Sequence, residues 1–173
     1  MSVDIDFAAL SIKDALDLAI LIEEEARDRY QELADNLDVH NTGDAAQFFR
    51  FMMGCEAKHG EELSDKRREL FGTEPVVVDR SMLWDVEAPG YEATRTFMTL
   101  HEALRVAMAA ETKAFEFFDA ALSEVNDSEV RELFTELRQE EVEHMEMVRE
   151  QMRMVPEADG LDPADFADEP VAQ

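Results

Sequence analysis

Four long segments of the sequence carry apolar residues at helical spacing, and glutamate interrupts each apolar stripe near its middle. In two of the segments, histidine follows the glutamate three residues later. Residues three or four apart share one face of a helix, so these polar side chains would point in the same direction as the apolar ones. The stripes therefore predict four amphipathic helices with ionisable groups in a common core. The interrupting residues are Glu23, Glu56, His59, Glu111, Glu141 and His144.

The stripes match in pairs along the chain, which indicates an internal repeat of two helical hairpins. In the first and third stripes, Leu16 corresponds to Leu104 and Glu23 to Glu111. The second and fourth stripes correspond in the same way, and each contains Glu-x-x-His. The expected inward positions of the second stripe are Ala45, Phe49, Met52, Glu56, His59, Leu63, Lys66 and Leu70. Those of the fourth are Val130, Phe134, Leu137, Glu141, His144, Val148, Gln151 and Val155.

Local signals place the ends of the helices. Ser11 and Thr99 each begin a sequence typical of an N-terminal cap, and residues 126–128 offer further capping side chains. Gly72 is a favoured residue for ending a helix. The expected helices span residues 11–37, 44–71, 99–125 and 128–154.

The connections indicate how these helices pack. Short loops after the first and third helices imply antiparallel neighbours, whereas residues 73–98 are long enough to cross the length of a bundle. No segment has the pattern of a β-strand. We predict an all-α, antiparallel four-helix bundle over residues 1–155 and an acidic C-terminal tail over residues 156–173.

The charge balance narrows the classes of partner. The chain of 173 residues has 42 acidic and 16 basic side chains, for a formal net charge of −26. Such a surface repels phosphate backbones and anionic lipids, so we expect no nucleic-acid or membrane partner, and cations are the natural small ligands. Without an apolar membrane span or an export signal, the expected location is cytoplasmic. The single cysteine, Cys55, excludes a cysteine-based zinc or rubredoxin knuckle.

Four glutamates at matching heights in a bundle core would repel one another and be costly to bury. Two divalent cations would neutralise these carboxylates and use their oxygens as ligands. One Glu from each of two helices, with Glu-x-x-His from each of the other two, is the pattern of di-iron and di-manganese carboxylate bundles. Carboxylate and imidazole donors without thiolates suit Fe(II) and Mn(II). The alternative is a bundle without metal, in which these residues are solvated.

Over about residues 8–154 the chain resembles the ferritin-like di-metal proteins of the rubrerythrin or erythrin branch. The resemblance implies a ferritin-like bundle with a long crossover between its second and third helices. It also implies two metal ions, iron in the first place, with manganese or zinc as alternatives. The motifs that carry it are Glu23-x-x-Ala26-x-x-x-Tyr30, Glu56-x-x-His59, Glu111-x-x-Ala114-x-x-x-Phe118 and Glu141-x-x-His144.

The resemblance assigns a role to each candidate ligand. Two glutamates would be terminal ligands, two would bridge the metals, and each histidine would complete the shell of one metal. These are Glu23 and Glu111, Glu56 and Glu141, and His59 and His144, in that order.

The chain departs from rubrerythrins proper in two respects. They carry a second glutamate three residues after the ligand of the third helix, where this chain has Ala114. They also usually carry a rubredoxin domain with four cysteines, whereas Cys55 is the only cysteine here. We therefore expect a simpler six-ligand site, closer to the oxidase centre of ferritin.

The resemblance implies a di-iron oxidoreductase that oxidises Fe(II) with dioxygen or hydrogen peroxide. An external electron donor and a homodimer or larger homo-oligomer are the expected partners. The alternatives are a non-catalytic iron-storage or delivery subunit of a larger assembly, and a structural helical module that has lost its metal.

Several residues near the motifs have two interpretations. Tyr30, on the stripe of Glu23, either donates a hydrogen bond to a ligand carboxylate or is a core aromatic with its hydroxyl satisfied. We interpret Cys55 as a small buried side chain. The flanking acids fall mostly off the stripes and are expected to be solvated; they are Glu24, Glu25, Glu61, Glu62, Glu140 and Glu143.

Overall fold

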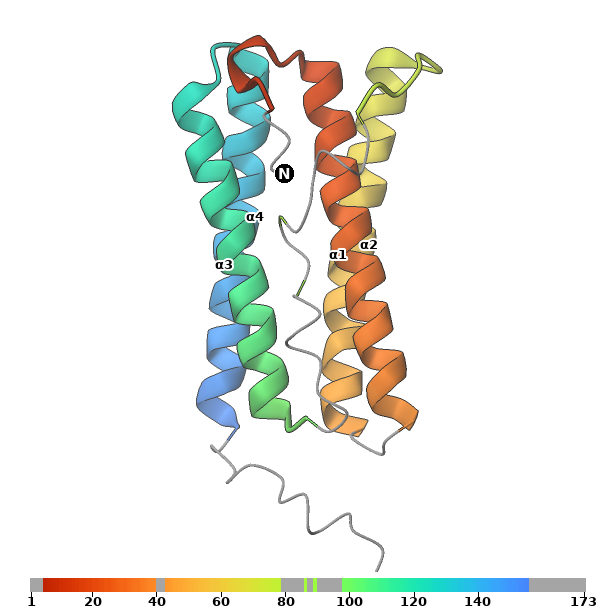
Figure 1. Ribbon diagram of the computed structural model, residues 1–173, viewed down its shortest axis with the longest axis vertical. Helices are drawn as coiled ribbons and strands as arrows, with labels where there is room; N and C mark the ends of the chain where they lie inside the picture. Colours follow the sequence, from red (N-terminus) through yellow and green to blue (C-terminus); the bar gives the residue numbers. More distant parts are fainter. Residues whose placement is uncertain (1–4, 40–42, 79–85, 87–88, 90–97, 156–173) are drawn as a thin grey trace, which may run out of the picture.

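The computed structural model describes residues 5–39, 43–78, 86, 89 and 98–155, and helices are the only regular secondary structure in this part of the chain (Figure 1). A short 3₁₀ helix, η1 (Phe7–Ala9), precedes four long α-helices, and no described residue is in a strand. The predicted all-α class is confirmed. The long helices are α1 (Ile12–Val39), α2 (Gly43–Phe71), α3 (Leu100–Glu124) and α4 (Ser128–Met154). None of the described helices is long and apolar enough to span a membrane.

The helices form two hairpins that face each other. α1 packs along α2 and α3 along α4, each pair antiparallel (Figure 1). α2 and α3 run in the same direction, so α2 ends at one end of the bundle and α3 begins at the opposite end. This is the ferritin-like arrangement that the sequence predicts. Most of the connecting segment, including Trp84, and the tail at 156–173 lie outside the described residues, so the domain boundary stays a prediction.

The predicted caps form the helix ends. The backbone N–H of Asp14 donates to the Ser11 hydroxyl oxygen, and Thr99 forms a capping box with Glu102. The Asp127 carboxylate accepts hydrogen bonds from the first turn of α4. At the end of α2, Gly72 adopts a φ of 55°, the left-handed conformation that glycine tolerates best.

The inward faces follow the predicted stripes except near the ends of α2 and α4. Lys66 and Leu70 were expected inside but are exposed, and Arg67 is buried in their place. In α4, Gln151 is exposed and Met152 is half-buried. An α-helix has 3.6 residues per turn, so a row counted by alternating threes and fours drifts around a straight helix. After three heptads, the residue that points inward is the one that follows the counted position.

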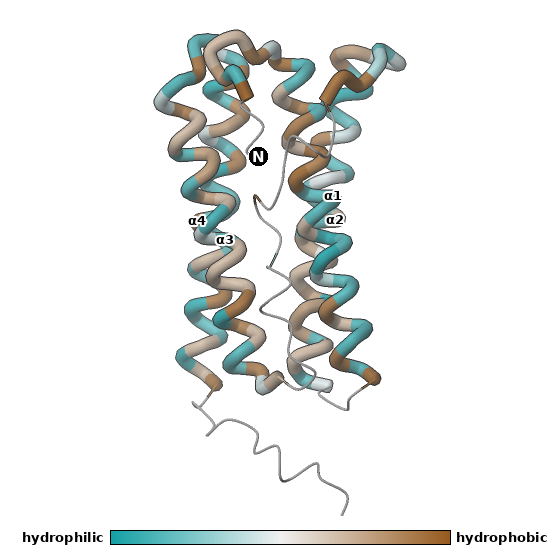
Figure 2. The backbone as a smooth tube through the Cα atoms, in the orientation of Figure 1, coloured by the Kyte–Doolittle hydropathy of each residue, from teal (hydrophilic) through white to brown (hydrophobic). Residues whose placement is uncertain are grey.

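The bundle contains two apolar clusters, one toward each end. One includes Leu16, Phe118 and Phe134, and the other includes Phe49 and Leu104. Figure 2 shows that apolar and polar residues alternate along all four helices, as expected for helices with one buried face. Between the two clusters in sequence, the inward positions are occupied by the candidate metal ligands.

A buried ion pair ties α1 to the end of α2. The Arg67 Nε donates to the Asp17 Oδ1 at 2.8 Å, and Lys13 donates to the other carboxylate oxygen at 2.8 Å. Arg67 also donates to the carbonyl oxygens of Gly72 and Glu74, beyond the last turn of α2. One guanidinium therefore joins two helices and fixes the chain where it leaves the bundle.

We expect Asp17→Asn to destabilise the fold in a pH-dependent manner. Burial alone would raise the pKa of Asp17, but the hydrogen bonds from Arg67 and Lys13 outweigh it and lower that pKa. The stabilisation is therefore present above the unfolded pKa of about 3.9 and is lost as the pH falls through the folded pKa. Urea unfolding at pH 7 should show a loss of about 3 kcal/mol, which shrinks below about pH 4.

The matched control for this prediction is Asp28→Asn. Asp28 lies on the same helix and pairs with Arg27, but both side chains are well exposed. An exposed ion pair contributes less than about 1 kcal/mol. Equal losses in the two variants would contradict a special role for the buried pair.

Candidate metal centre

The six predicted ligands lie in one layer at the middle of the bundle, one or two from each helix. Five of them are buried, and His59 is half-buried. Glu23 is on α1, Glu111 on α3, and each Glu-x-x-His pair occupies one turn of α2 or α4. The structure therefore brings together the residues that the stripes indicated.

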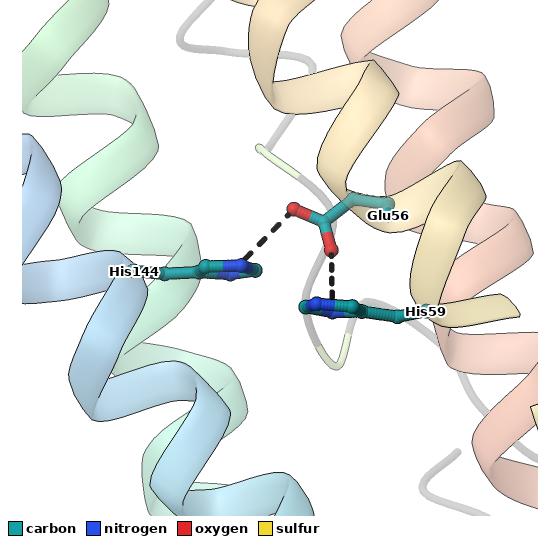
Figure 3. Close-up of side chains that lie close together, drawn as sticks. All are labelled: Glu56, His59 and His144. Atoms are coloured by element: carbon teal, nitrogen blue, oxygen red, sulfur yellow. Dashed lines mark ion pairs between the residues drawn. The ribbon is translucent and has the colours of Figure 1, made fainter. Parts of the chain in front are cut away.

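Glu56 lies between the two histidines (Figure 3). Its Oε1 is 3.8 Å from the Nδ1 of His144, and its Oε2 is 3.9 Å from the Nδ1 of His59. The two imidazole rings are nearly parallel, with centroids 5.0 Å apart and an interplanar angle of 5°. Histidines from opposite hairpins thus present their Nδ1 atoms to one carboxylate.

Glu111 has a close polar neighbour at each carboxylate oxygen. The Tyr30 hydroxyl donates to its Oε1 at 2.6 Å, and the Nδ1 of His144 lies 2.9 Å from its Oε2. The Tyr30 ring is fully buried and stacks on Phe49. Tyr30 is thus a core aromatic whose hydroxyl is satisfied by a candidate ligand, so its two interpretations hold together.

Three sets of donor atoms are close enough to hold a metal ion, with the atoms of each set within 4.8 Å of one another. Between them the sets include all six predicted ligands and one additional residue, Glu140. The sets are Glu56, His59 and His144; Glu111, Glu141 and His144; and Glu23, His59 and Glu140.

The electrostatics of the layer favour a bound cation. Burial raises the pKa of Glu56 well above its ordinary value, and the charges of Glu111 and Glu23 raise it further. Burial lowers the pKa of His59, and the neighbouring His144 adds to this effect. A neutral imidazole is the form that binds metal. Each shift disfavours the charged side chain, and a divalent cation reverses that preference at the carboxylate.

The Glu56 carboxylate gives the sharpest test of fit. The side chain is fully buried, and neither oxygen accepts a hydrogen bond from the described residues. A buried acceptor left in this way costs about 1–3 kcal/mol. Coordination to a metal ion would satisfy both oxygens, so the donor set fits two divalent ions of the iron or manganese type.

The sequence pattern does not identify Glu140 as a possible metal ligand. Glu140 was expected to be solvated, but it is half-buried, its Oε2 is 4.0 Å from the Nδ1 of His59, and burial raises its pKa. The signal was its position four residues before His144, which places both on one side of α4. The flanking residues Glu61, Glu62 and Glu143 are exposed as expected, while Glu24 and Glu25 are half-buried.

Cys55 is half-buried rather than buried. Burial raises the pKa of its thiol to about 11, with smaller contributions from the charges of Glu56 and Glu111. The thiol therefore stays protonated at neutral pH, and the ligand set remains one of carboxylates and imidazoles.

Two comparisons with known proteins bear on this geometry. The chain is similar to an uncharacterised conserved protein of Magnetospirillum magnetotacticum MS-1, with 28% identity and a TM-score of 0.69. The match covers 87% of this chain and 99% of that one. No curated protein matches the sequence significantly. The family model for rubrerythrin matches residues 14–152, which include all four helices' candidate ligands. Because this match spans most of the chain, the protein belongs to the rubrerythrin family.

Proposed function

We propose that this protein is a di-iron oxidoreductase that oxidises Fe(II) with dioxygen or hydrogen peroxide. The observation that carries the proposal is the buried layer of four glutamates and two histidines, in which the Glu56 oxygens accept no hydrogen bond from the described residues. Membership of a family that typically binds iron supports it. The external electron donor, the homo-oligomer and the cytoplasmic location stay predictions of the sequence.

The resemblance to the family assigns two kinds of ligand. Glu56 and Glu141, from the Glu-x-x-His turns of opposite hairpins, would be shared between the two ions. Glu23 and Glu111 would each complete one ion's shell, as would His59 and His144; the full set is Glu23, Glu56, His59, Glu111, Glu141 and His144. When bound, two iron ions supply two electrons to one oxidant molecule, which avoids release of a one-electron radical.

The surrounding residues keep this layer ordered. The apolar clusters exclude water from the two ends of the layer, which strengthens electrostatic interactions inside the site. Tyr30 holds the Glu111 carboxylate in one orientation through its 2.6 Å hydrogen bond. Glu56, whose pKa is raised by burial, would release its proton when a metal ion binds.

The central prediction is about two metal ions per chain and oxidation of added Fe(II). Anaerobic loading, followed by air or peroxide, should produce the near-ultraviolet absorption of protein-bound ferric iron. Changing Glu56 and Glu141 together to Ala should abolish this absorption and leave the helical circular dichroism largely intact. Oxidation that persists in the double variant would place the chemistry elsewhere. Tight binding without oxidation would favour the storage or delivery function instead.

Glu56→Gln should show how much the buried Glu56 carboxylate destabilises the metal-free protein. The folded pKa of Glu56 lies above the unfolded value of about 4.3, so the metal-free protein loses stability as the pH rises from that value toward the folded pKa. At pH 7 in chelator, the variant should be more stable than wild type by about 1–3 kcal/mol. The two should converge near pH 4.

Addition of Mn(II) should reverse the order of stability in that experiment, because only wild type retains the Glu56 carboxylate as a ligand. Glu69→Gln is the control, since Glu69 is an exposed residue of the same helix. Its stability should match wild type within about 0.5 kcal/mol with and without metal. A metal-free Glu56→Gln protein that is less stable than wild type at pH 7 would contradict the electrostatic account.

Tyr30→Phe tests whether the tyrosine acts on its carboxylate partner. The bundle accommodates phenylalanine at the matching position, Phe118, so the fold should be retained. Loss of the hydroxyl should weaken metal binding by about 10-fold or more, measured by competition with a chelator. Unchanged affinity would mean that Tyr30 serves only as a core aromatic.

A further inference from the structure

A cleft on the α1–α2 hairpin reaches the candidate metal centre. Its volume is about 310 Å³, and it lies between the middle of α1 and the second half of α2. Candidate ligands, flanking acids and two arginines line it. The carboxylates are Glu23, Glu24, Glu56, Glu61 and Asp65, and the arginines are Arg27 and Arg68. The cleft therefore includes groups at the surface and groups in the buried layer.

Small residues at one-turn spacing on α2 keep the cleft open. Ala57, Gly60 and Ser64 line it on the side that faces α1. Gly60 lies directly against Glu23, since a Cβ added at Gly60 would be 3.5 Å from the Glu23 Cβ. Larger side chains at these positions would fill the space next to the ligand.

The buried end of the cleft is a carboxylate suited to receive a cation. Glu56 is 1% exposed, lines the cleft, and has two oxygens that accept no hydrogen bond from the described residues. At the outer end, Glu61 and Asp65 are exposed, and Asp65 pairs with Arg68. The five carboxylates outnumber the two guanidinium groups, so negative charge predominates between the rim and Glu56.

A second opening, between α2 and α4, is smaller and has a more apolar lining. This groove of about 160 Å³ reaches His59 and Glu140, but leucines form much of its wall, namely Leu63, Leu133 and Leu137. Two of its three acids are paired with lysines: Glu62 with Lys58, and Glu136 with Lys66. The smaller volume and the apolar wall make this groove a poorer path for a metal cation.

We propose that the α1–α2 cleft is the route by which divalent metal ions reach the centre, with Glu61 attracting the ion at the rim. The proposal rests on the proposed function, since it assumes a metal centre at Glu23 and Glu56. The cleft would be the surface that the substrate, a hydrated divalent cation, contacts before any oxidation takes place.

The test measures the rate of Co(II) uptake by metal-free protein under anaerobic conditions, using the visible ligand-field absorption of the bound ion. Glu61→Gln should slow uptake by about threefold at low salt, and the effect should vanish at high ionic strength. Glu62→Gln is the matched control. It removes the same charge from the adjacent exposed residue of the same helix, but it faces the α2–α4 groove, so uptake should keep its wild-type rate.

A second pair of variants tests the path itself. Ser64→Phe should fill the cleft one turn from Gly60 and slow uptake by at least about 10-fold, without touching a predicted ligand, while Ser64→Ala should behave as wild type. If the phenylalanine variant does not fold, Ala57→Leu at the exposed side of the cleft replaces it. The proposal stands only if both the rim variant and the filling variant slow uptake. Equal slowing by Glu62→Gln, or wild-type uptake in either cleft variant, overturns it.

Equilibrium measurements separate this proposal from the proposed function. The cleft variants should still bind as much Co(II) as wild type after long incubation, because their ligands are unchanged. Slow uptake with no oxidation of Fe(II) would support the route and contradict the oxidoreductase. Normal oxidation with unchanged uptake rates would support the oxidoreductase and contradict the route. A wild-type protein that binds no Co(II) would contradict both.

Discussion

Four carboxylates share one buried layer, and their mutual repulsion is the constraint on which the rest of the structure depends. Glu23, Glu56, Glu111 and Glu141 are each at most 2% exposed. Burial and the neighbouring charges already raise the pKa of Glu56. A layer of this kind persists only when strong packing holds the helices around it and when cations compensate its charge. The apolar clusters on either side provide the packing, and the six donors provide a place for the cations.

Much of the molecule serves to hold the candidate ligands at the same height in the bundle. Each helix is long enough to contribute to an apolar cluster at both ends of the bundle and to one polar turn between them. The Asp17–Arg67 pair joins α1 to the end of α2, away from the polar layer. The stabilising contacts thus lie toward the ends of the hairpins, and the ionisable candidate ligands occupy the middle. Small residues such as Gly60 can be tolerated beside Glu23 because the ends of the helices are well anchored.

The parts of the fold that depend on local sequence were predictable. Caps at Ser11 and Thr99 act within one turn, and the apolar stripes repeat within each helix, so both can be recognised without knowledge of the partner helix. Arg67 and Glu140 were not recognised, because their burial depends on which helix lies opposite. Arg67 faces Asp17 of α1, while Glu140 faces His59 of α2. The burial of such a charged residue can be predicted only when its partner on the opposite helix is known.

The hydrogen bond from Tyr30 to Glu111 also has a consequence for symmetry. The two hairpins repeat each other in sequence, so each ligand of one hairpin has a counterpart in the other. Tyr30 breaks that relation, because its counterpart Phe118 has no hydroxyl to offer Glu23. The two halves of the layer are therefore chemically unequal although their helices are alike. Two identical ions would occupy positions of different character, one against an oriented carboxylate and one beside the acidic cleft.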